Sequence, residues 1–237
     1  VMGHNSLSTN TTGSSNTAIG RGALNANTTA SNNTAVGYFA LLANTTGTQN
    51  VSVGAYALDA NTTANDNTGV GYGALSANTT GASNTALSNS LGGNTTGANN
   101  TGLGHFALAN NTTASNNTAV GKSALTANTT GASGNAFGTD ALASNTTGLG
   151  NAAFGNAALY ANISGKENSA FGSSYTQYAP LRFNTTGDYN TAVGVGALYS
   201  NTTAANNTAV GHTALGANTT GTDNVALGAY ALDSNTT

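Results

Sequence analysis

The sequence NTAVGYFALLANTTGTQ, residues 33–49, is the unit from which almost the whole chain is built. Its most regular landmark is the Asn of an Asn-Thr-Thr triplet, here Asn44, which we name the Asn44 row. The row comprises Asn10, Asn27, Asn44, Asn61, Asn78, Asn94, Asn111, Asn128, Asn145, Asn162, Asn184, Asn201, Asn218 and Asn235. The spacing is seventeen residues, except that one residue is missing before Asn94 and five are added before Asn184. A short fixed period predicts structural coils, each stacked on its neighbours.

The composition excludes several classes of protein. Only 5% of the 237 residues are charged, the net charge is -3, and there is no Cys. Four basic residues provide no electrostatic surface for nucleic acid or anionic lipid. Without cysteine, disulfides and thiolate metal sites are impossible. No run of about twenty apolar residues is present to insert into a membrane.

One position of the repeat is always apolar, and we name it the Val36 row. It comprises Met2, Ile19, Val36, Val53, Val70, Leu87, Leu103, Val120, Phe137, Phe154, Phe171, Val193, Val210 and Leu227. We expect this row to face an interior, with the three consecutive Phe stacked on successive coils. The Leu41 row, which is Leu in all fourteen copies from Leu7 to Leu232, is the second expected core row.

Two positions on either side of Val36 are restricted by size. The Ala35 row contains only Ala, Ser or Gly from Ala18 to Ala119, and the Gly37 row is Gly in every copy except Ser88. Neighbouring residues of a strand point to opposite faces. If Val36 faces an interior, the opposite face is also confined, and we expect another chain of the same kind to pack there.

The position after the Gly varies freely, and we name it the Tyr38 row. It comprises His4, Arg21, Tyr38, Ala55, Tyr72, Asn89, His105, Lys122, Thr139, Asn156, Ser173, Val195, His212 and Ala229. We expect an exposed row. A surface for binding carbohydrate or matrix would use Tyr38, Tyr72, His105 and Lys122, together with Tyr175, Tyr178 and Arg182 of the five-residue insertion.

The apolar positions recur every seventeen residues in short runs bounded by Gly and Asn, and no 3.6-residue period persists. The sequence therefore predicts an all-β parallel β-solenoid, or β-roll, of about fourteen stacked coils. Residues 1–237 form one repeat array, which we expect to be part of a longer fibre, and residues 173–183 form an inserted loop. One coil cannot fold alone, because ordering seventeen residues costs roughly 17–34 kcal/mol of backbone entropy.

The motif Asn-Thr-Ala-Val-Gly-x-x-Ala-Leu resembles the head repeats of trimeric autotransporter adhesins. It is also similar to the repeat arrays of tail-fibre-like bacterial surface proteins that end in an endosialidase-type chaperone domain. The resemblance covers the whole chain and implies a left-handed parallel β-roll with three chains around one axis. The seventeen-residue period is longer than that of adhesin coils, and no neck, stalk, anchor or chaperone domain is present in the sequence.

Every member of the Asn44 row begins an Asn-x-Ser/Thr glycosylation acceptor, including Asn162-Ile163-Ser164. A second Asn row, which contains Asn16, Asn33, Asn50, Asn67, Asn84, Asn100 and Asn117, mostly lacks that motif. Two interpretations stay open. Either the Asn44 row carries N-glycans, or its side chains form a hydrogen-bonded ladder beside a turn.

Catalysis needs titratable groups that converge, and the seven acidic residues are scattered along the repeats. Asp59 and Asp66 are the only close pair in the sequence, and they fall at different edges of one coil. We predict no enzymatic activity, no cofactor and no metal site. A Thr-rich face could bind ice, but Thr45 and Thr46 are adjacent and would point apart.

These observations predict a structural segment of an extracellular fibre, such as a surface appendage, secreted fibril or virion fibre. The expected partners are further copies of the same chain, as a homotrimer or an end-to-end polymer. Covalent glycans or host-surface carbohydrate are further expected partners. The alternatives are an adhesin or receptor-binding fibre module and, more remotely, an ice-binding β-solenoid.

Overall fold

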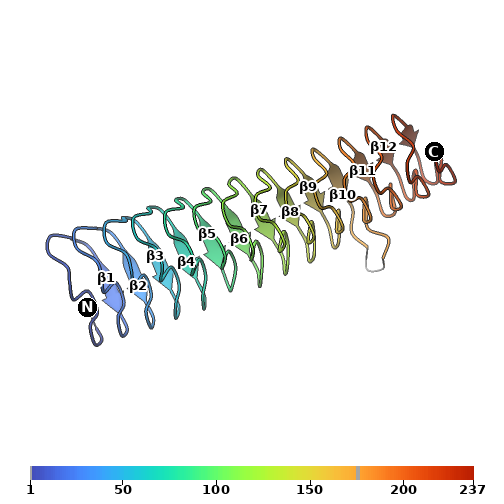
Figure 1. Ribbon diagram of the computed structural model, residues 1–237. Helices are drawn as coiled ribbons and strands as arrows, with labels where there is room; N and C mark the ends of the chain where they lie inside the picture. The colour runs from blue at the N-terminus through green and yellow to red at the C-terminus, as the bar shows by residue number, and fades with distance from the viewer. Residues whose placement is uncertain (1, 175–176) are drawn as a thin grey trace. The chain divides into compact units, whose positions relative to one another are not determined.

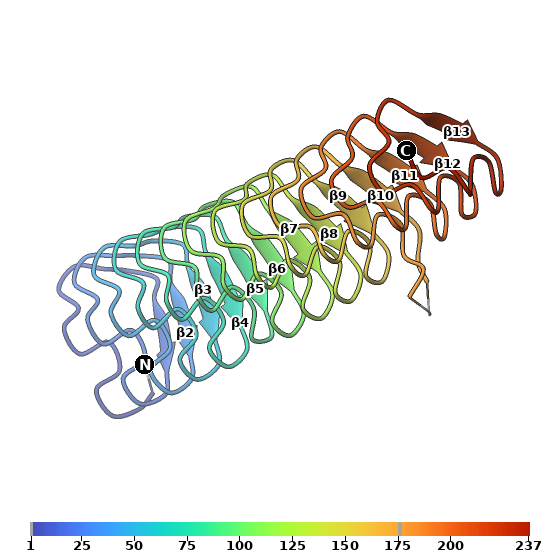
Figure 2. The ribbon, with the colours of Figure 1, turned by 45° about the vertical axis from the view of Figure 1, so that its right-hand side comes forward.

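The computed structural model describes residues 2–174 and 177–237. The chain divides into two compact units, Val1–Asn116 and Asn117–Thr237. Each unit is a parallel β-solenoid with about seventeen residues per coil, which confirms the predicted fold class. Figures 1 and 2 show that, within each unit, the strands line one face of the coils and loops complete the remaining sides.

Each coil contributes one strand of three residues. The strands of the first unit are β1 (Thr17–Ile19), β2 (Thr34–Val36), β3 (Val51–Val53), β4 (Thr68–Val70), β5 (Thr85–Leu87) and β6 (Thr101–Leu103). Those of the second are β7 (Thr118–Val120), β8 (Asn135–Phe137), β9 (Ala152–Phe154), β10 (Ser169–Phe171), β11 (Thr191–Val193), β12 (Thr208–Val210) and β13 (Val225–Leu227). Met2 adds an isolated parallel bridge to Ile19.

Neighbouring strands pair residue for residue at the same position of the repeat. Between β2 and β3, for example, Ala35 is opposite Ser52 and Val36 is opposite Val53. Because the register never shifts, each position of the repeat forms a column of identical or similar side chains along the unit. The rows defined from the sequence are therefore physical columns.

The interior of each coil is filled by the Leu41 row and the Ala35 row. Leu41 and Leu58 are fully buried, as are Ala35 and Ser52, whose hydroxyl donates to the carbonyl of Ala57 at 2.7 Å. The prediction that the Leu41 row is a core row is confirmed. Its members take the left-handed conformation, with φ 52° at both Leu41 and Leu58.

This left-handed backbone is costly for Leu, by roughly 1–2 kcal/mol per residue. Burial of the side chain stabilises by roughly 1.5–3 kcal/mol, and the Leu41 N–H donates to the carbonyl of Ala57 on the next coil at 3.0 Å. The burial and the hydrogen bond together offset the backbone cost. This balance accounts for a bulky residue in a conformation that glycine usually takes.

The expectation that the Val36 row faces an interior is wrong. Ile19, Leu87 and Phe137 are 41%, 44% and 36% exposed, whereas the Ala35 row is buried. The strand alternates as expected, but the small residue points inward and the large one outward. The interior opposite the Leu41 row has room only for Ala, Ser or Gly.

The predicted stacking of the three Phe is confirmed, although it occurs on the outer face. Phe137 and Phe154 have ring centroids 4.8 Å apart, and Phe154 and Phe171 are 4.9 Å apart, with interplanar angles of 7° and 8°. The separation matches the rung spacing of a parallel sheet.

No second chain is needed to confine the Ala35 and Gly37 rows, so that expectation is also wrong. Ala35 is confined by its own coil. A Cβ added to Gly37, whose φ is 143°, would lie 2.5 Å from the carbonyl oxygen of Gly54 on the next coil. The Gly37 row is thus a line of close backbone approach between coils.

Two buried ladders of Asn side chains join the coils. In the Asn44 row, Asn61 Nδ2 donates to Asn44 Oδ1 at 3.0 Å and to the carbonyl of Ala64 at 3.1 Å. In the second row, Asn50 donates through its backbone N–H to Asn33 Oδ1 at 2.9 Å and through Nδ2 to the Ala64 carbonyl at 2.9 Å. Both amides thus tie neighbouring coils together, whereas the buried Nδ2 of Asn67, in the second row, has no hydrogen-bond partner.

The two irregular coils keep both ladders in register. Across the short coil, Asn94 Nδ2 still donates to Asn78 Oδ1 at 2.8 Å, and across the long coil Asn184 Nδ2 donates to Asn162 Oδ1 at 2.9 Å. The insertion is shorter than the predicted loop 173–183. Tyr178 accepts from the Gly196 N–H at 2.8 Å, as members of the Tyr38 row do, so the coil has resumed by residue 178.

We expect Leu58→Ala to lower the free energy of unfolding by about 2–5 kcal/mol, because it empties part of the Leu41-row column that fills the interior. Val53→Ala removes fewer buried atoms on the outer face and should cost roughly 1 kcal/mol or less. Chemical denaturation followed by circular dichroism measures both. A larger loss for Val53→Ala than for Leu58→Ala would contradict the inward direction of the Leu41 row.

Candidate functional site

The Tyr38 row lies on the surface, where the sequence predicted it. Tyr38 is 38% and Tyr72 67% exposed, and His105 and Lys122 are also exposed. Of the insertion residues, Tyr178 is exposed, Arg182 is half-buried, and Tyr175 lies outside the described residues. Tyr38, Tyr72 and His105 belong to the first unit, and Lys122, Tyr178 and Arg182 belong to the second.

Aromatic rings gather along this surface in the first unit. Tyr38 and Phe39 have ring centroids 4.1 Å apart, Tyr56 lies 5.4 Å from Tyr38, and Tyr72 lies 6.0 Å from Tyr56. The Arg21 guanidinium lies 5.9 Å from the centre of the Tyr38 ring. Partial burial and the neighbouring Tyr38 raise the pKa of the Tyr56 hydroxyl. We name Arg21, Tyr38, Phe39, Tyr56 and Tyr72 the first aromatic cluster.

The second unit has a similar gathering around the insertion. Arg182 lies 4.9 Å from the ring centre of Tyr160, and Tyr199 lies 5.0 Å from both Tyr178 and Phe183. The sequence analysis missed Tyr160, Phe183 and Tyr199. Tyr160, Arg182 and Tyr199 each directly follow a residue of the Leu41 row, and this shared position indicates that they form one column.

Two hollows in the surface lie beside glycines of a further row, next to the Tyr38 row. This Phe39 row comprises Asn5, Gly22, Phe39, Tyr56, Gly73, Phe106, Ser123, Asp140, Ala157, Gly196, Thr213 and Tyr230, all with positive φ. A hollow of about 150 Å³ lies at Gly22 and is lined by Asn5, Arg21, Gly22, Asn25, Phe39 and Leu42. A second hollow, of about 350 Å³, is lined by Tyr178, Val195, His212 and Thr213, next to Gly196. A glycine of the Phe39 row, which has no side chain, thus lies at or beside each hollow.

The Asn44 row does not offer free amides to a glycan. All its members except Asn10 and Asn235 are at most 2% exposed. Asn44 Nδ2, the atom that a sugar would modify, donates to Asn27 Oδ1 at 3.3 Å and to the Gly47 carbonyl at 2.9 Å. A sugar on this nitrogen would displace a hydrogen bond and open the coil. The geometry favours the ladder interpretation over glycosylation.

The adjacent Thr residues of the triplet differ in environment. Thr45 is half-buried, and its hydroxyl donates to the carbonyl of Thr62 on the next coil at 3.2 Å, whereas Thr46 is exposed. The two columns therefore do not present equivalent hydroxyl groups to solvent. Ice binding stays an untested prediction.

Acidic residues do not converge in the described part of the chain. No group of three or more His, Cys, Asp or Glu with metal-binding geometry occurs among those residues. Asp59 is half-buried, and its Oδ1 has no hydrogen-bond partner. Desolvation raises the pKa of this carboxyl, although the backbone N–H groups of Asp59 and Ala60 partly oppose the shift.

The described residues also contain no helix whose length and apolar character would let it cross a bilayer. No protein-family model, curated protein or solved structure matches the chain. The resemblance to adhesin and tail-fibre repeats therefore stays a prediction from the repeat motif.

We expect peptide mapping of the natural protein over the Asn27 to Asn78 region to return unmodified Asn. The reason is that the ladder uses the amide nitrogens and buries them. Intact mass against the polypeptide mass gives the same information for the whole chain. A glycan on a buried member such as Asn44 would contradict the ladder.

The raised pKa of Asp59 predicts a pH-dependent stability. Folding disfavours the carboxylate, so the contribution of Asp59 is fully present below the unfolded pKa of about 3.9 and is lost as pH rises through the folded value. Asp59→Asn should remove this loss, which thermal unfolding between pH 3 and pH 7 would measure. Asp66→Asn, on an exposed residue of the same coil, is the control and should keep the wild-type profile. An unchanged pH profile in Asp59→Asn would refute the assignment.

Proposed function

We propose that this chain is a structural repeat segment of an extracellular fibre or surface appendage. The proposal rests on the positions of the residues that stay the same in nearly every repeat. The Leu41 row fills the interior, the Gly37 row brings the backbones of neighbouring coils close together, and the Asn44 row forms a buried ladder. These three rows therefore all serve the stacking of one coil on the next. The extracellular location rests on the resemblance to adhesin and tail-fibre repeats.

The expected partner in such a fibre is another copy of the chain, bound through the outer face of the strands. The Val36 row is apolar in every copy although Ile19, Leu87 and Phe137 are more than a third exposed. The neighbouring Tyr38 row accepts basic, aromatic, neutral polar and small aliphatic side chains. A surface row that excludes polar residues is typical of a contact site.

A second copy suits this row because its side chains repeat with the same rung spacing, about 4.8 Å. Apolar columns of equal period can pack along their whole length, whereas an unrelated surface would match only locally. Three chains around one axis is the arrangement that the adhesin resemblance implies.

An adhesin module is the alternative function. It is favoured by the exposed rings of the first aromatic cluster and by the rings around Arg182, since aromatic and Arg side chains are frequent anchors in binding sites. The candidate ligands are carbohydrate or matrix, as predicted from the sequence. Alanine substitutions at Tyr38 and Tyr72 that abolish glycan or cell binding by intact fibres would support this function.

We expect the triple variant Val36→Asp, Val53→Asp, Val70→Asp to dissociate into single chains, as measured by sedimentation equilibrium. Charges on the outer face would have to be buried in the contact. The control is Tyr38→Asp, Ala55→Asp, Tyr72→Asp, which places equal charge on the same three coils and should stay assembled.

Circular dichroism shows whether both triple variants remain folded. If the first one unfolds, the milder triple change of the same Val residues to Thr replaces it, because Thr keeps the β-branched shape. A single-chain wild-type protein, or equal assembly of the Val36-row and Tyr38-row variants, would count against the proposed contact.

A further inference from the structure

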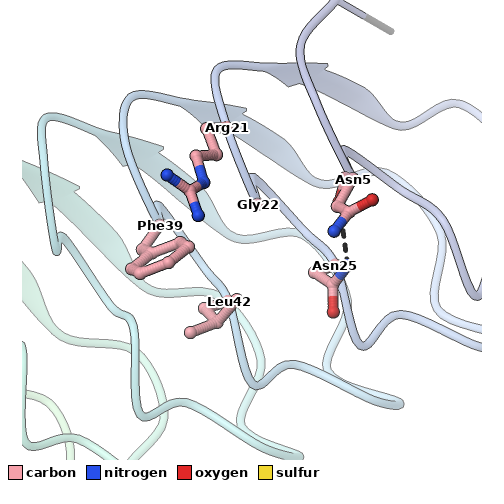
Figure 3. Close-up of a pocket in the computed structure, with 6 residues that line it drawn as sticks. All are labelled: Asn5, Arg21, Gly22, Asn25, Phe39 and Leu42. Carbon is pink, nitrogen blue, oxygen red and sulfur yellow. Dashed lines mark hydrogen bonds between the residues drawn. The ribbon is translucent and has the colours of Figure 1, made fainter.

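The hollow at Gly22 combines a cation, an apolar wall and a missing side chain (Figure 3). In this view Arg21 and Phe39 lie on one side, Asn5 and Asn25 on the other, and Leu42 below, with Gly22 between them. All six lining residues belong to the first unit. The hollow differs from the proposed contact face, which is formed by the Val36 row.

The absence of a side chain at residue 22 lets the Phe39 ring pack against the backbone, where the ring forms one wall of the hollow. A Cβ at this position would lie 2.5 Å from Cδ1 and 2.6 Å from Cε1 of the Phe39 ring. The backbone itself accepts larger residues here, because Phe39 and Tyr56 of the same row have φ 56° and 58°, close to 67° at Gly22. The glycine is thus required for space beside the ring more than for its conformation.

Two hydrogen-bonding groups at the rim, the Arg21 guanidinium and Asn25 Oδ1, are available to a ligand. The Arg21 guanidinium has no ion pair among the described residues, and its described contact is with the Tyr38 ring, 5.9 Å away. Asn25 Nδ2 donates to the carbonyl of Asn5 at 2.8 Å and to Ser8 Oγ at 2.7 Å. These bonds fix the Asn25 side chain and leave its Oδ1 as an acceptor. No acidic residue lines the hollow.

The remaining walls are the Phe39 ring and the Leu42 side chain. A volume of about 150 Å³ is comparable to that of a cavity that holds benzene, so one six-membered ring fits. The ligand should therefore have a compact ring with an apolar face, a negative group for Arg21, and hydroxyl groups for the Asn side chains. One guanidinium with an apolar wall suits a carboxylate better than a phosphate, for which several converging donors are usual.

We propose that this hollow binds a uronic acid, a sugar with a carboxylate on its six-membered ring. Arg21 donates two parallel hydrogen bonds to the carboxylate. The C–H face of the sugar packs on Phe39 and Leu42, while Asn25 Oδ1 accepts from a ring hydroxyl. The binding does not depend on assembly of the fibre, and its test is separate from the test of the contact face.

The test uses the full 237-residue chain labelled with ¹⁵N and titrated with methyl glucuronide, methyl glucoside or acetate, followed by NMR. We expect saturable shifts with the glucuronide that include Gly22 and Phe39, and at least tenfold weaker binding of glucoside and of acetate. Arg21→Gln should weaken glucuronide binding at least tenfold, because the charge-assisted bonds are lost.

Gly22→Ala should also abolish glucuronide binding, because the added Cβ would overlap the Phe39 ring and displace this wall of the hollow. Gly73→Ala is the matched control: it lies in the same row with φ 63°, and its added Cβ would meet only Asn89 Oδ1 at 3.7 Å. Gly73→Ala should bind methyl glucuronide as tightly as the wild type does.

Absence of saturable glucuronide binding would overturn the proposal. Equal binding of acetate would reduce the site to an exposed Arg and overturn the sugar assignment. Equal binding of the glucoside would overturn the role of the carboxylate. Retained binding in Gly22→Ala, in a variant with a wild-type circular dichroism spectrum, would place the ligand elsewhere.

Discussion

The hydrogen bonds of the buried Asn amides are the constraint on which the rest of the structure depends. Asn61 accepts from Asn78 and donates to both Asn44 and the Ala64 carbonyl, so it connects three coils. Burying an amide without partners costs roughly 1–3 kcal/mol even by mutational scales. A buried Asn amide keeps its partner on the neighbouring coil only if that coil places the same group directly in line with it. This requirement holds the register and hence the period.

The direction of the strand residues shows what the sequence pattern can and cannot establish. Alternation places Ala35 and Val36 on opposite faces, but it does not say which face is inside. Hydrophobicity favoured Val36, and the structure buries Ala35. The better indicator was variation in size. From Ala18 to Ala226 the Ala35 row never exceeds Ser in size, as expected of a closed interior, whereas the Val36 row ranges from Val to Phe, as expected of a face with room.

The repeat period, the parallel coils, the Leu41 column and the stacked Phe rings followed from the sequence, because each depends on residues one period apart. The candidate site followed only in part. Tyr38 and Tyr72 were found from their row, but the pairing of Arg182 with Tyr160 and the hollow at Gly22 were not. The members of the Arg182–Tyr160 pair share one row, but the five-residue insertion lies between them and takes them out of the seventeen-residue spacing. The hollow needs contacts between different rows on neighbouring coils, and such contacts depend on how the turn after the Gly37 row is folded.

That turn is also where the chain varies most, for a physical reason. The short coil lacks its Phe39-row residue, and the long coil gains residues after Gly172, in the same segment between the Gly37 and Leu41 rows. Neither change disturbs the ladders, because Asn94 and Asn184 still bond to the Asn of the coil before. The segment projects outward and is anchored at both ends, so its side chains can change without loss of the fold. The first aromatic cluster and the glycines beside both hollows therefore lie in a segment whose outward side chains the ladders do not constrain.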